Sequence, residues 1–259
     1  MMIRTSLIVA LFAVPAAPAR AGFESAFPST VEGLVIPNAH DLKLESKGRV
    51  IRGMAPRHEQ DIRDLIALGV EDILAFKQAW KDEVNEGIAL LKEMGYKEDR
   101  LHHIPFRWKY FESFQKPCRQ TLEAVKILRD AERDGRTVFF HCTVGEDRTG
   151  YLAAVYRLLA QGRTAEDVFQ NEMCLHGYGA GNPQKPVERV VLKIRRELTP
   201  LYLKMAYLVS IGAVTLDNLD GSACAAEPSE AAVGSLFDEK DFRCETSPRY
   251  PFDAPPMAR

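Results

Sequence analysis

Two hydrophobic periods alternate along the middle of the chain. Short runs rich in β-branched and aromatic residues, bounded by glycine or proline, are typical of buried strands. Apolar residues that recur every three or four positions between these runs mark one face of a helix. We expect strands at residues 49–54, 70–76, 101–106 and 137–140, and helices near residues 62–66, 81–94, 120–134 and 151–161.

This alternation of strands and helices predicts an α/β fold, with a mostly parallel central sheet flanked by helices. Farther along the chain, a capping pattern at Thr164 predicts a helix that runs toward His176, and Pro186 suits the first turn of another. A last apolar run, at 201–214, contains Lys204 and is too short to span a membrane. We interpret this run as a core helix.

The N-terminus has the three parts of a secretory signal peptide. Arg4 supplies a charged start, residues 6–14 are almost wholly apolar, and residues 19–21 supply a small-residue end. We expect this peptide to be cleaved and the protein to be periplasmic or secreted. The predicted parts are the signal peptide at 1–21, a wrapping segment at 22–48, one domain at 49–214 and an irregular tail at 215–259.

Composition and charge limit the possible partners. With 259 residues and 46% hydrophobic content, the chain can bury one good core. Removal of the signal peptide would delete Arg4 and Arg20 and no acidic residue, which changes the formal net charge from −2 to −4. Such a charge does not steer the protein toward nucleic acid, and the sequence contains no nucleic-acid-binding motif. An anion must therefore bind in a local basic cleft.

The strand at 137–140 is joined to the helix at 151–161 by His141-Cys142-Thr143-Val144-Gly145-Glu146-Asp147-Arg148-Thr149-Gly150. A tight turn that enters a helix directs several backbone N–H groups and the positive end of the helix dipole into one concavity. This arrangement suits a phosphate, and it lowers the pKa of a thiol, so Cys142 is expected to be ionised at neutral pH. The planar guanidinium of Arg148 matches two phosphate oxygens.

This loop resembles the phosphate loop of the cysteine-dependent protein-tyrosine and dual-specificity phosphatases, which reads His-Cys-x5-Arg-Ser/Thr. His141, Cys142, Arg148 and Thr149 match that motif position for position, and the resemblance extends over roughly residues 49–208. It implies the α/β fold of that superfamily and hydrolysis of phosphomonoesters. Exported relatives with this loop include the phosphatase-like phytases, which act on inositol polyphosphates.

The resemblance also implies a role for each loop residue. The thiolate of Cys142 would attack phosphorus and form a phosphocysteine that water then hydrolyses. The loop at residues 143–146 and the Arg148 guanidinium would bind the phosphoryl oxygens, and Thr149 would donate a hydrogen bond to the departing sulfur. His141 would order the loop. No metal ion or cofactor is required, but the sulfur must be within reach of solvent and must face Arg148.

The general acid is not where the superfamily usually has it. That position would be an aspartate soon after the strand at 101–106, but no aspartate lies between Asp99 and Asp130. Asp147 resembles the aspartate that some of these phosphatases carry inside the phosphate loop. Glu112 is the alternative, if its segment folds over the pocket. We favour Asp147.

From the resemblance we expect the substrate to be either an inositol polyphosphate or a phosphotyrosine-type protein. Arg107 and Lys109 are the candidate substrate ligands outside the loop, and Trp108, Tyr110 and Phe111 could wall a phosphotyrosine pocket. A molecule with several phosphates would need a basic cluster at the ligand edge of the sheet. The basic residues expected there are Arg52, Arg57, Lys77, Lys81, Arg107 and Lys109.

Two other functions remain open at this stage. A phosphate-binding module would bind anions without releasing phosphate. A thiol-based reductase or sulfurtransferase would use the same loop, and a reductase would need a resolving cysteine such as Cys118 or Cys174 near Cys142. Five cysteines in an exported chain suggest pairs plus one free nucleophile. We expect Cys224 to pair with Cys244 in the tail, whereas Cys118 and Cys174 are free or paired.

Overall fold

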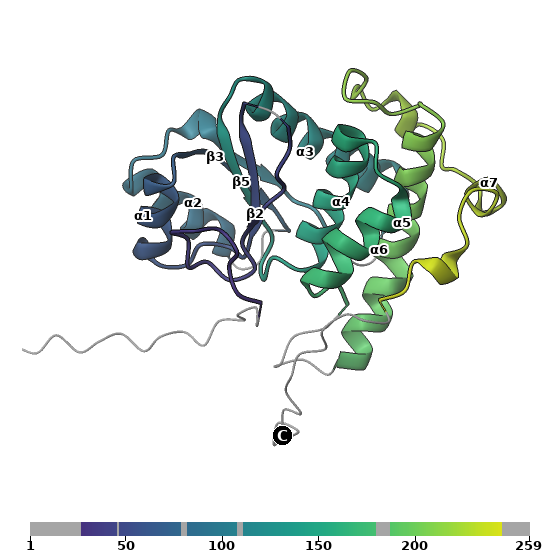
Figure 1. The fold of residues 1–259 in the computed structure, drawn as a ribbon, viewed down its shortest axis with the longest axis horizontal. Coiled ribbons are helices and arrows are strands. Elements are labelled where there is room, and N and C mark those ends of the chain that lie inside the picture. The colour runs from purple at the N-terminus through teal and green to yellow at the C-terminus, as the bar shows by residue number, and fades with distance from the viewer. Residues whose placement is uncertain (1–26, 46, 79–81, 108–110, 180–186, 245–259) are drawn as a thin grey trace, which may run out of the picture.

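The structure, a computed structural model, describes residues 27–45, 47–78, 82–107, 111–179 and 187–244. A five-stranded sheet lies at its centre, with helices on both faces (Figure 1). The strand order across the sheet is β1-β2-β5-β3-β4. The strands are β1 (His40–Asp41), β2 (Arg49–Gly53), β3 (Val70–Phe76), β4 (Leu101–Ile104) and β5 (Thr137–His141).

All pairings in the sheet are parallel except that of β1 with β2. This finding confirms the predicted α/β fold with a mostly parallel sheet. His141, the last residue of β5, pairs with Gly53 on one side and Ala75 on the other. The loop that follows β5 therefore emerges between the carboxyl ends of β2 and β3, which is where such sheets bind ligands.

Strand β5 is the centre of the hydrophobic core. Side chains along a strand alternate between the two faces of the sheet. Val138 and Phe140 accordingly pack in the core on one face, whereas Phe139 packs in the core on the other. All three are buried, so β5 reads as a continuous apolar run, as expected for a parallel strand that is covered on both faces.

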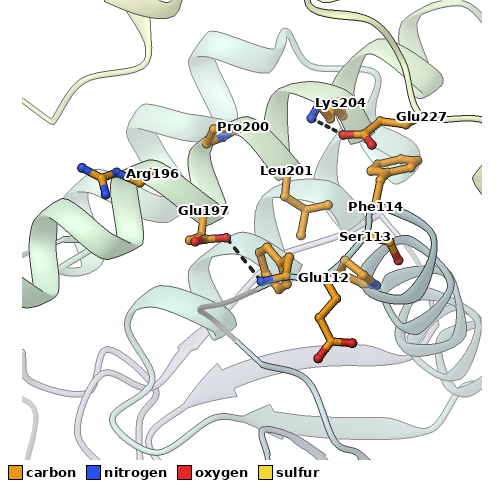
Figure 2. Close-up of a pocket in the computed structure, with 11 residues that line it drawn as sticks. Glu112, Ser113, Phe114, Arg196, Glu197, Pro200, Leu201, Lys204 and Glu227 are labelled. Atoms are coloured by element: carbon orange, nitrogen blue, oxygen red, sulfur yellow. Dashed lines mark hydrogen bonds and ion pairs between the residues drawn. The ribbon is translucent and has the colours of Figure 1, made fainter.

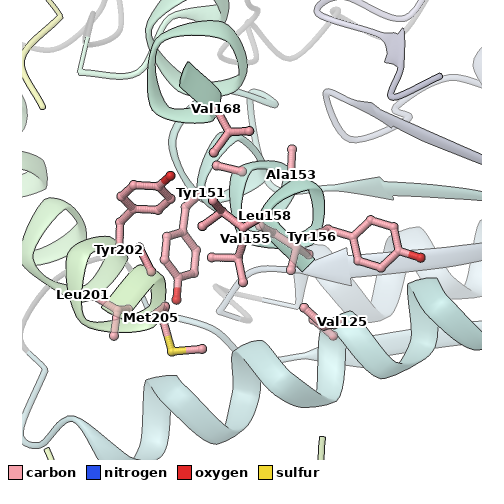
Figure 3. Close-up of a cluster of buried hydrophobic side chains, with 14 of the residues drawn as sticks. Val125, Tyr151, Ala153, Val155, Tyr156, Leu158, Val168, Leu201, Tyr202 and Met205 are labelled. Atoms are coloured by element: carbon pink, nitrogen blue, oxygen red, sulfur yellow. The ribbon is translucent and has the colours of Figure 1, made fainter. Parts of the chain in front are cut away.

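The helices cover the sheet as two layers (Figure 1). Helices α1 and α2 pack on the face that contains Phe139, and α3, α4 and α6 pack on the other face. In Figure 3, Val125 of α3, Val155 of α4 and Tyr202 of α6 meet in this larger core. The helices are α1 (Glu59–Ala67), α2 (Glu83–Glu93), α3 (Gln115–Arg133), α4 (Asp147–Gln161), α5 (Ala165–Val168), α6 (Val187–Ser210) and α7 (Glu230–Gly234).

Two helices differ from the sequence prediction in ways that matter. Helix α4 begins at Asp147, so Arg148 and Thr149 lie in its first turn. The helices expected after Pro186 and over 201–214 form a single helix of 24 residues, α6, with Pro200 inside it. A proline removes one helical hydrogen bond, but Leu198 and Tyr202 on either side are buried in the same core, which holds the helix together. No described helix is both long and apolar enough to cross a membrane.

The segments that flank the domain pack against it. The expected wrapping segment contributes Leu34 and Ile36 to the smaller core and Leu42 to the larger one, and it forms β1. The tail is less irregular than expected, because residues 222–224 and 239–241 form 3₁₀ turns and α7 lies between them. The expected signal peptide lies outside the described residues.

The predicted disulfide between Cys224 and Cys244 is wrong. Cys224 pairs with Cys118 of α3, and Cys244 pairs with Cys174, which lies in a 3₁₀ turn after α5. The tail folds back over the domain, so each of its cysteines meets a cysteine of the domain instead of the other tail cysteine. The two bridges join residues that are 106 and 70 positions apart in the sequence, which fastens the polar tail to the core.

This pairing predicts the outcome of peptide mapping without reduction. Proteolysis of the oxidised protein should release one peptide pair that contains Cys118 and Cys224 and another that contains Cys174 and Cys244. Replacement of both Cys118 and Cys224 by serine should lower the free energy of unfolding by about 2–4 kcal/mol, because the unfolded chain loses a long-range constraint. Mass spectrometry and denaturant titration measure the two effects. A peptide that links Cys224 to Cys244 would contradict the structure.

Candidate active site

The loop between β5 and α4 is held in a tight bend. Gly145 has a φ of 76°, which side chains other than glycine rarely tolerate. A Cβ at this position would also lie 2.5 Å from the carbonyl carbon of Gly53. The backbone of β2 therefore presses directly against the loop. Both the left-handed turn and this close approach require glycine at position 145.

Cys142 lies at the base of this loop, as the sequence predicts. Burial alone would raise the pKa of the thiol, but the charge of Arg148 and hydrogen bonds from Thr149 outweigh it, so the pKa lies below its usual value. Cys142 is only 1% exposed, so the expectation that its sulfur lies within reach of solvent is not met in this structure. Arg148 donates a hydrogen bond to the hydroxyl of Thr143 across the loop, at 3.2 Å. We expect an entering phosphate to break this contact and to accept hydrogen bonds from both the Arg148 guanidinium and the Thr143 hydroxyl.

Thr149 and His141 brace the two ends of the loop. The hydroxyl of Thr149 accepts a hydrogen bond from the backbone N–H of Cys142, at 2.8 Å, which links the first turn of α4 to the end of β5. The Nδ1 atom of His141 lies 2.8 Å from the carbonyl oxygen of Cys142. Burial, together with the charge of Lys77, lowers the pKa of His141 to about 3. The imidazole is therefore neutral near pH 7, which suits a role in ordering the loop.

The two candidate acids lie in different surroundings. The carboxylate of Asp147 accepts a hydrogen bond from the N–H of Gly179, at 2.9 Å, and burial raises its pKa to about 6. Glu112 is exposed at the edge of a cavity of about 250 Å³ between the segment before α3 and helix α6 (Figure 2). Asp147 is part of the loop itself, whereas Glu112 would have to reach it from this cavity.

The basic residues that the structure describes do not form an exposed cluster at the ligand edge of the sheet. Arg52 is fully buried behind the loop, and Lys77 is buried in an ion pair with Glu83, at 2.7 Å. Arg57 is partly buried, and Arg107 is exposed. Lys81 and Lys109, together with Trp108 and Tyr110, lie outside the described residues. Of the four expected basic residues that the structure describes, Arg107 is therefore the one that is exposed.

The residues behind the loop make contacts that were not predicted from the sequence. Arg52 of β2 and Asn38 of the wrapping segment both donate to the carbonyl oxygen of Gly145, at 2.9 Å and 3.0 Å. Glu172 pairs with Arg52 at 3.5 Å and with Arg157 at 3.0 Å. The signal in the sequence was an arginine that directly follows Val50 and Ile51 in a predicted strand, because such a charge is rarely buried without a dedicated partner.

One group of side chains behind the loop has the composition of a metal site. Possible ligand atoms of His40, Glu172 and His176 lie within 4.8 Å of one another. However, the two imidazole rings stack 3.6 Å apart at an angle of 23°, so their lone pairs do not converge on one point. The carboxylate of Glu172 is already paired with two arginines. These contacts favour a packed ion-pair cluster over a metal site.

The chain resembles known phosphatases over this region. A model of the tyrosine phosphatase family matches residues 46–171. No curated protein matches the chain. Among solved structures, TpbA of P. aeruginosa is 25% identical with a TM-score of 0.41, and the match covers 61% of this chain and 86% of TpbA. A mutant form of Tk-PTP is 15% identical with a TM-score of 0.46, and the match covers 62% of this chain and 92% of Tk-PTP.

A third solved structure is the catalytic domain of Siw14 from S. cerevisiae. It is 20% identical with a TM-score of 0.42, and the match covers 54% of this chain and 76% of Siw14. The region that matches the family model contains β2 to α4 and therefore the whole loop from Cys142 to Arg148. Residues 46–171 thus form a domain of the tyrosine phosphatase family, and this chain is a cysteine-dependent phosphatase.

Proposed function

We propose that this chain is an exported phosphomonoesterase that acts through a phosphocysteine intermediate. The observation that carries the proposal is the lowered pKa of Cys142 in a loop that it shares with Arg148 and the first turn of α4. A thiolate is the nucleophilic form of cysteine. Export is supported by the N-terminal sequence pattern and by the two disulfides, which persist in oxidising compartments.

The mechanism has two displacement steps. In the first, the sulfur of Cys142 attacks phosphorus, the P–O bond to the leaving group breaks, and the leaving oxygen takes a proton from the acid. In the second, water attacks phosphorus, gives a proton to the carboxylate formed in the first step and displaces the thiolate, which releases inorganic phosphate. The loop amides and Arg148 stabilise the phosphoryl oxygens in both transition states. Thr149 donates to the departing sulfur in the second step.

We assign the role of general acid to Asp147. Its position in the loop and its raised pKa support this assignment, because an effective acid has a pKa near the working pH. The hydrogen bond from Gly179 fixes the carboxyl group in one orientation. Glu112 remains the alternative acid, since it lies in the segment from which the superfamily usually supplies the acid.

The competing thiol chemistry is less well supported than phosphate hydrolysis. Cys118 and Cys174 were the candidate resolving cysteines, but both are paired with tail cysteines. Cys142 is therefore the one free cysteine of the chain. A reductase that resolves its nucleophile through a second internal cysteine would first have to break a disulfide.

The substrate is a phosphorylated small molecule or a phosphoprotein. TpbA has been solved in complex with pTyr, and Siw14 is a PP-IP phosphatase, so a substrate panel should contain both classes. The basic residues behind the loop are buried, so a substrate with several phosphates would rely on exposed groups such as Arg107. A phosphotyrosine substrate needs fewer charged contacts outside the loop.

A first prediction concerns turnover. The wild-type protein should release phosphate from an aryl phosphate, and the panel of phosphotyrosine peptides, nucleotides and inositol phosphates should reveal the preferred class. Cys142→Ser should lose essentially all turnover but still bind orthovanadate, because the amides and Arg148 remain. Phosphate release and calorimetry measure the two effects. Unchanged turnover in Cys142→Ser would refute the mechanism, and binding without turnover in the wild type would favour the phosphate-binding module.

A second prediction concerns the thiol. Because the pKa of Cys142 is lowered, the rate of alkylation by iodoacetamide should reach half its maximum well below pH 8.5, the usual range of a free thiol. Arg148→Met should move this midpoint upward, because the largest favourable charge on the thiolate is lost. Arg133→Met serves as the matched control, because Arg133 is an exposed arginine at the C-terminal end of α3. An identical midpoint in all three proteins would contradict the assignment of Arg148.

A third prediction separates the two candidate acids. A general acid must be protonated, so kcat for an alkyl phosphate should fall as pH rises through about 6, the pKa of Asp147. Asp147→Asn should remove this dependence and lower kcat about 10²- to 10⁴-fold, with a smaller effect on an aryl phosphate whose leaving group needs less protonation. Asparagine can still accept the hydrogen bond from Gly179, so the loop is preserved. If Glu112→Gln produces this loss instead, Glu112 is the acid.

A further inference from the structure

Arg52 is a charged side chain that is buried in the protein interior, where a charge is energetically unfavourable. Its guanidinium is 0% exposed, at the carboxyl end of β2. Burial of a charge costs several kcal/mol unless the group is paired and hydrogen-bonded. Glu172, only 4% exposed, supplies the opposite charge, and it is shared with Arg157. A methionine or leucine could fill the same space without this cost, so the contacts of the guanidinium need an explanation.

Those contacts join two segments of the active site. One terminal nitrogen of Arg52 donates to the carbonyl oxygens of Gly145 and Glu146, at 2.9 Å and 3.4 Å. The other donates to the backbone carbonyl and, at 3.5 Å, to the carboxylate of Glu172. The guanidinium therefore ties the phosphate loop to the segment after α5. The planar fork of arginine can hold both at once, which a lysine cannot do.

The direction of these hydrogen bonds matters for phosphate binding. The C=O and N–H groups of a trans peptide point in opposite directions. Because Arg52 draws the carbonyl of Gly145 toward the protein interior, the N–H of Glu146 in the same peptide must point away from Arg52, toward the open side of the loop. An N–H group on that side is the donor that a bound phosphate requires.

A second donor fixes the same peptide. The side-chain amide of Asn38 donates to the carbonyl oxygen of Gly145 at 3.0 Å and to that of His176 at 3.1 Å. Both lone pairs of the Gly145 carbonyl are thereby occupied. The flexible bend at Gly145 could otherwise rotate this peptide, since glycine has two nearly equal sets of backbone conformations. Two buried donors restrict it to one.

We propose that Arg52 is a positioning residue of the phosphatase, which, together with Asn38, holds the Gly145–Glu146 peptide so that its N–H faces the phosphate. Arg52 also places a positive charge behind Cys142, to which the thiolate is attracted. The proposal rests on phosphate binding in the loop, and so on the proposed function. It adds that the donors of this loop are oriented by a buried charge from a neighbouring strand.

The variants that test this proposal differ in which contact they remove. Arg52→Met keeps an apolar side chain but removes the charge and both terminal nitrogens that donate hydrogen bonds. Arg52→Lys keeps the charge but lacks the planar guanidinium. Asn38→Gly removes the second donor, and glycine tolerates the φ of 56° at this position. Arg157→Met is the matched control, because Arg157 pairs with Glu172 but donates instead to the carbonyl of Leu42.

The readouts are kcat/KM for an aryl phosphate and the inhibition constant of orthovanadate, which mimics the transition state. Both are measured below the melting temperature of each variant. Loss of one oriented donor in an oxyanion site costs about 10²- to 10³-fold. Arg52→Met should therefore lower kcat/KM about 100-fold and raise the inhibition constant of orthovanadate by a similar factor. Arg52→Lys should restore part of this loss, and Asn38→Gly should lose about 10-fold.

The control separates positioning from a purely structural role. Arg157→Met should lower the melting temperature yet keep kcat/KM and vanadate inhibition within about twofold of the wild type. If Arg52→Met does not fold, Arg52→Lys and Asn38→Gly still decide the question. The proposal is overturned if these variants keep the vanadate affinity of Arg157→Met. Failure of the wild type to release phosphate would instead refute the proposed function, which Cys142→Ser tests separately.

Discussion

The structure depends on one electrostatic constraint, which is that the thiolate of Cys142 must be stable inside the protein. Burial destabilises this charge, whereas the guanidinium of Arg148 and the hydrogen bonds from Thr149 stabilise it. Both residues lie in the first turn of α4, so they are fixed by the helix and not by a mobile loop. Groups that stabilise a thiolate also suit a phosphate, so in the proposed function one arrangement serves both the nucleophile and the substrate.

The rest of the fold supports this arrangement from below. The central position of β5 places the loop between β2 and β3, and the close approach of Gly53 and Gly145 lets the loop rest directly on the backbone of β2. Arg52 leaves β2 at that point and reaches the loop carbonyls. The Cys174–Cys244 disulfide fastens the tail to the segment that carries Glu172, the ion-pair partner of Arg52. Support for the loop thus extends from the sheet to the tail.

The features that could be predicted from the sequence are those set by residues that are close together in the chain. The run from β5 through the loop into α4 is continuous in the chain, so its strand period, its glycine and its helix period predicted the strand, the tight turn and the helix found there. Arg52 and Asn38 contact Gly145 across 93 and 107 residues, and Cys118 pairs with Cys224 across 106. No local period encodes such pairs, which explains the wrong disulfide and the misplaced basic cluster. Arg52 was expected in a basic cluster at the ligand edge of the sheet, whereas it is buried behind the loop.

The central claim is that Cys142 carries phosphate during turnover, and its most direct test is to trap that intermediate. The enzyme would be mixed with a rapidly hydrolysed aryl phosphate, quenched in acid within milliseconds, digested and analysed by mass spectrometry. The account predicts one phosphate on the peptide that contains Cys142, at a level that rises when the second step is slowed in Thr149→Ala. Turnover with no phosphate on Cys142, or with phosphate on another residue, would contradict it.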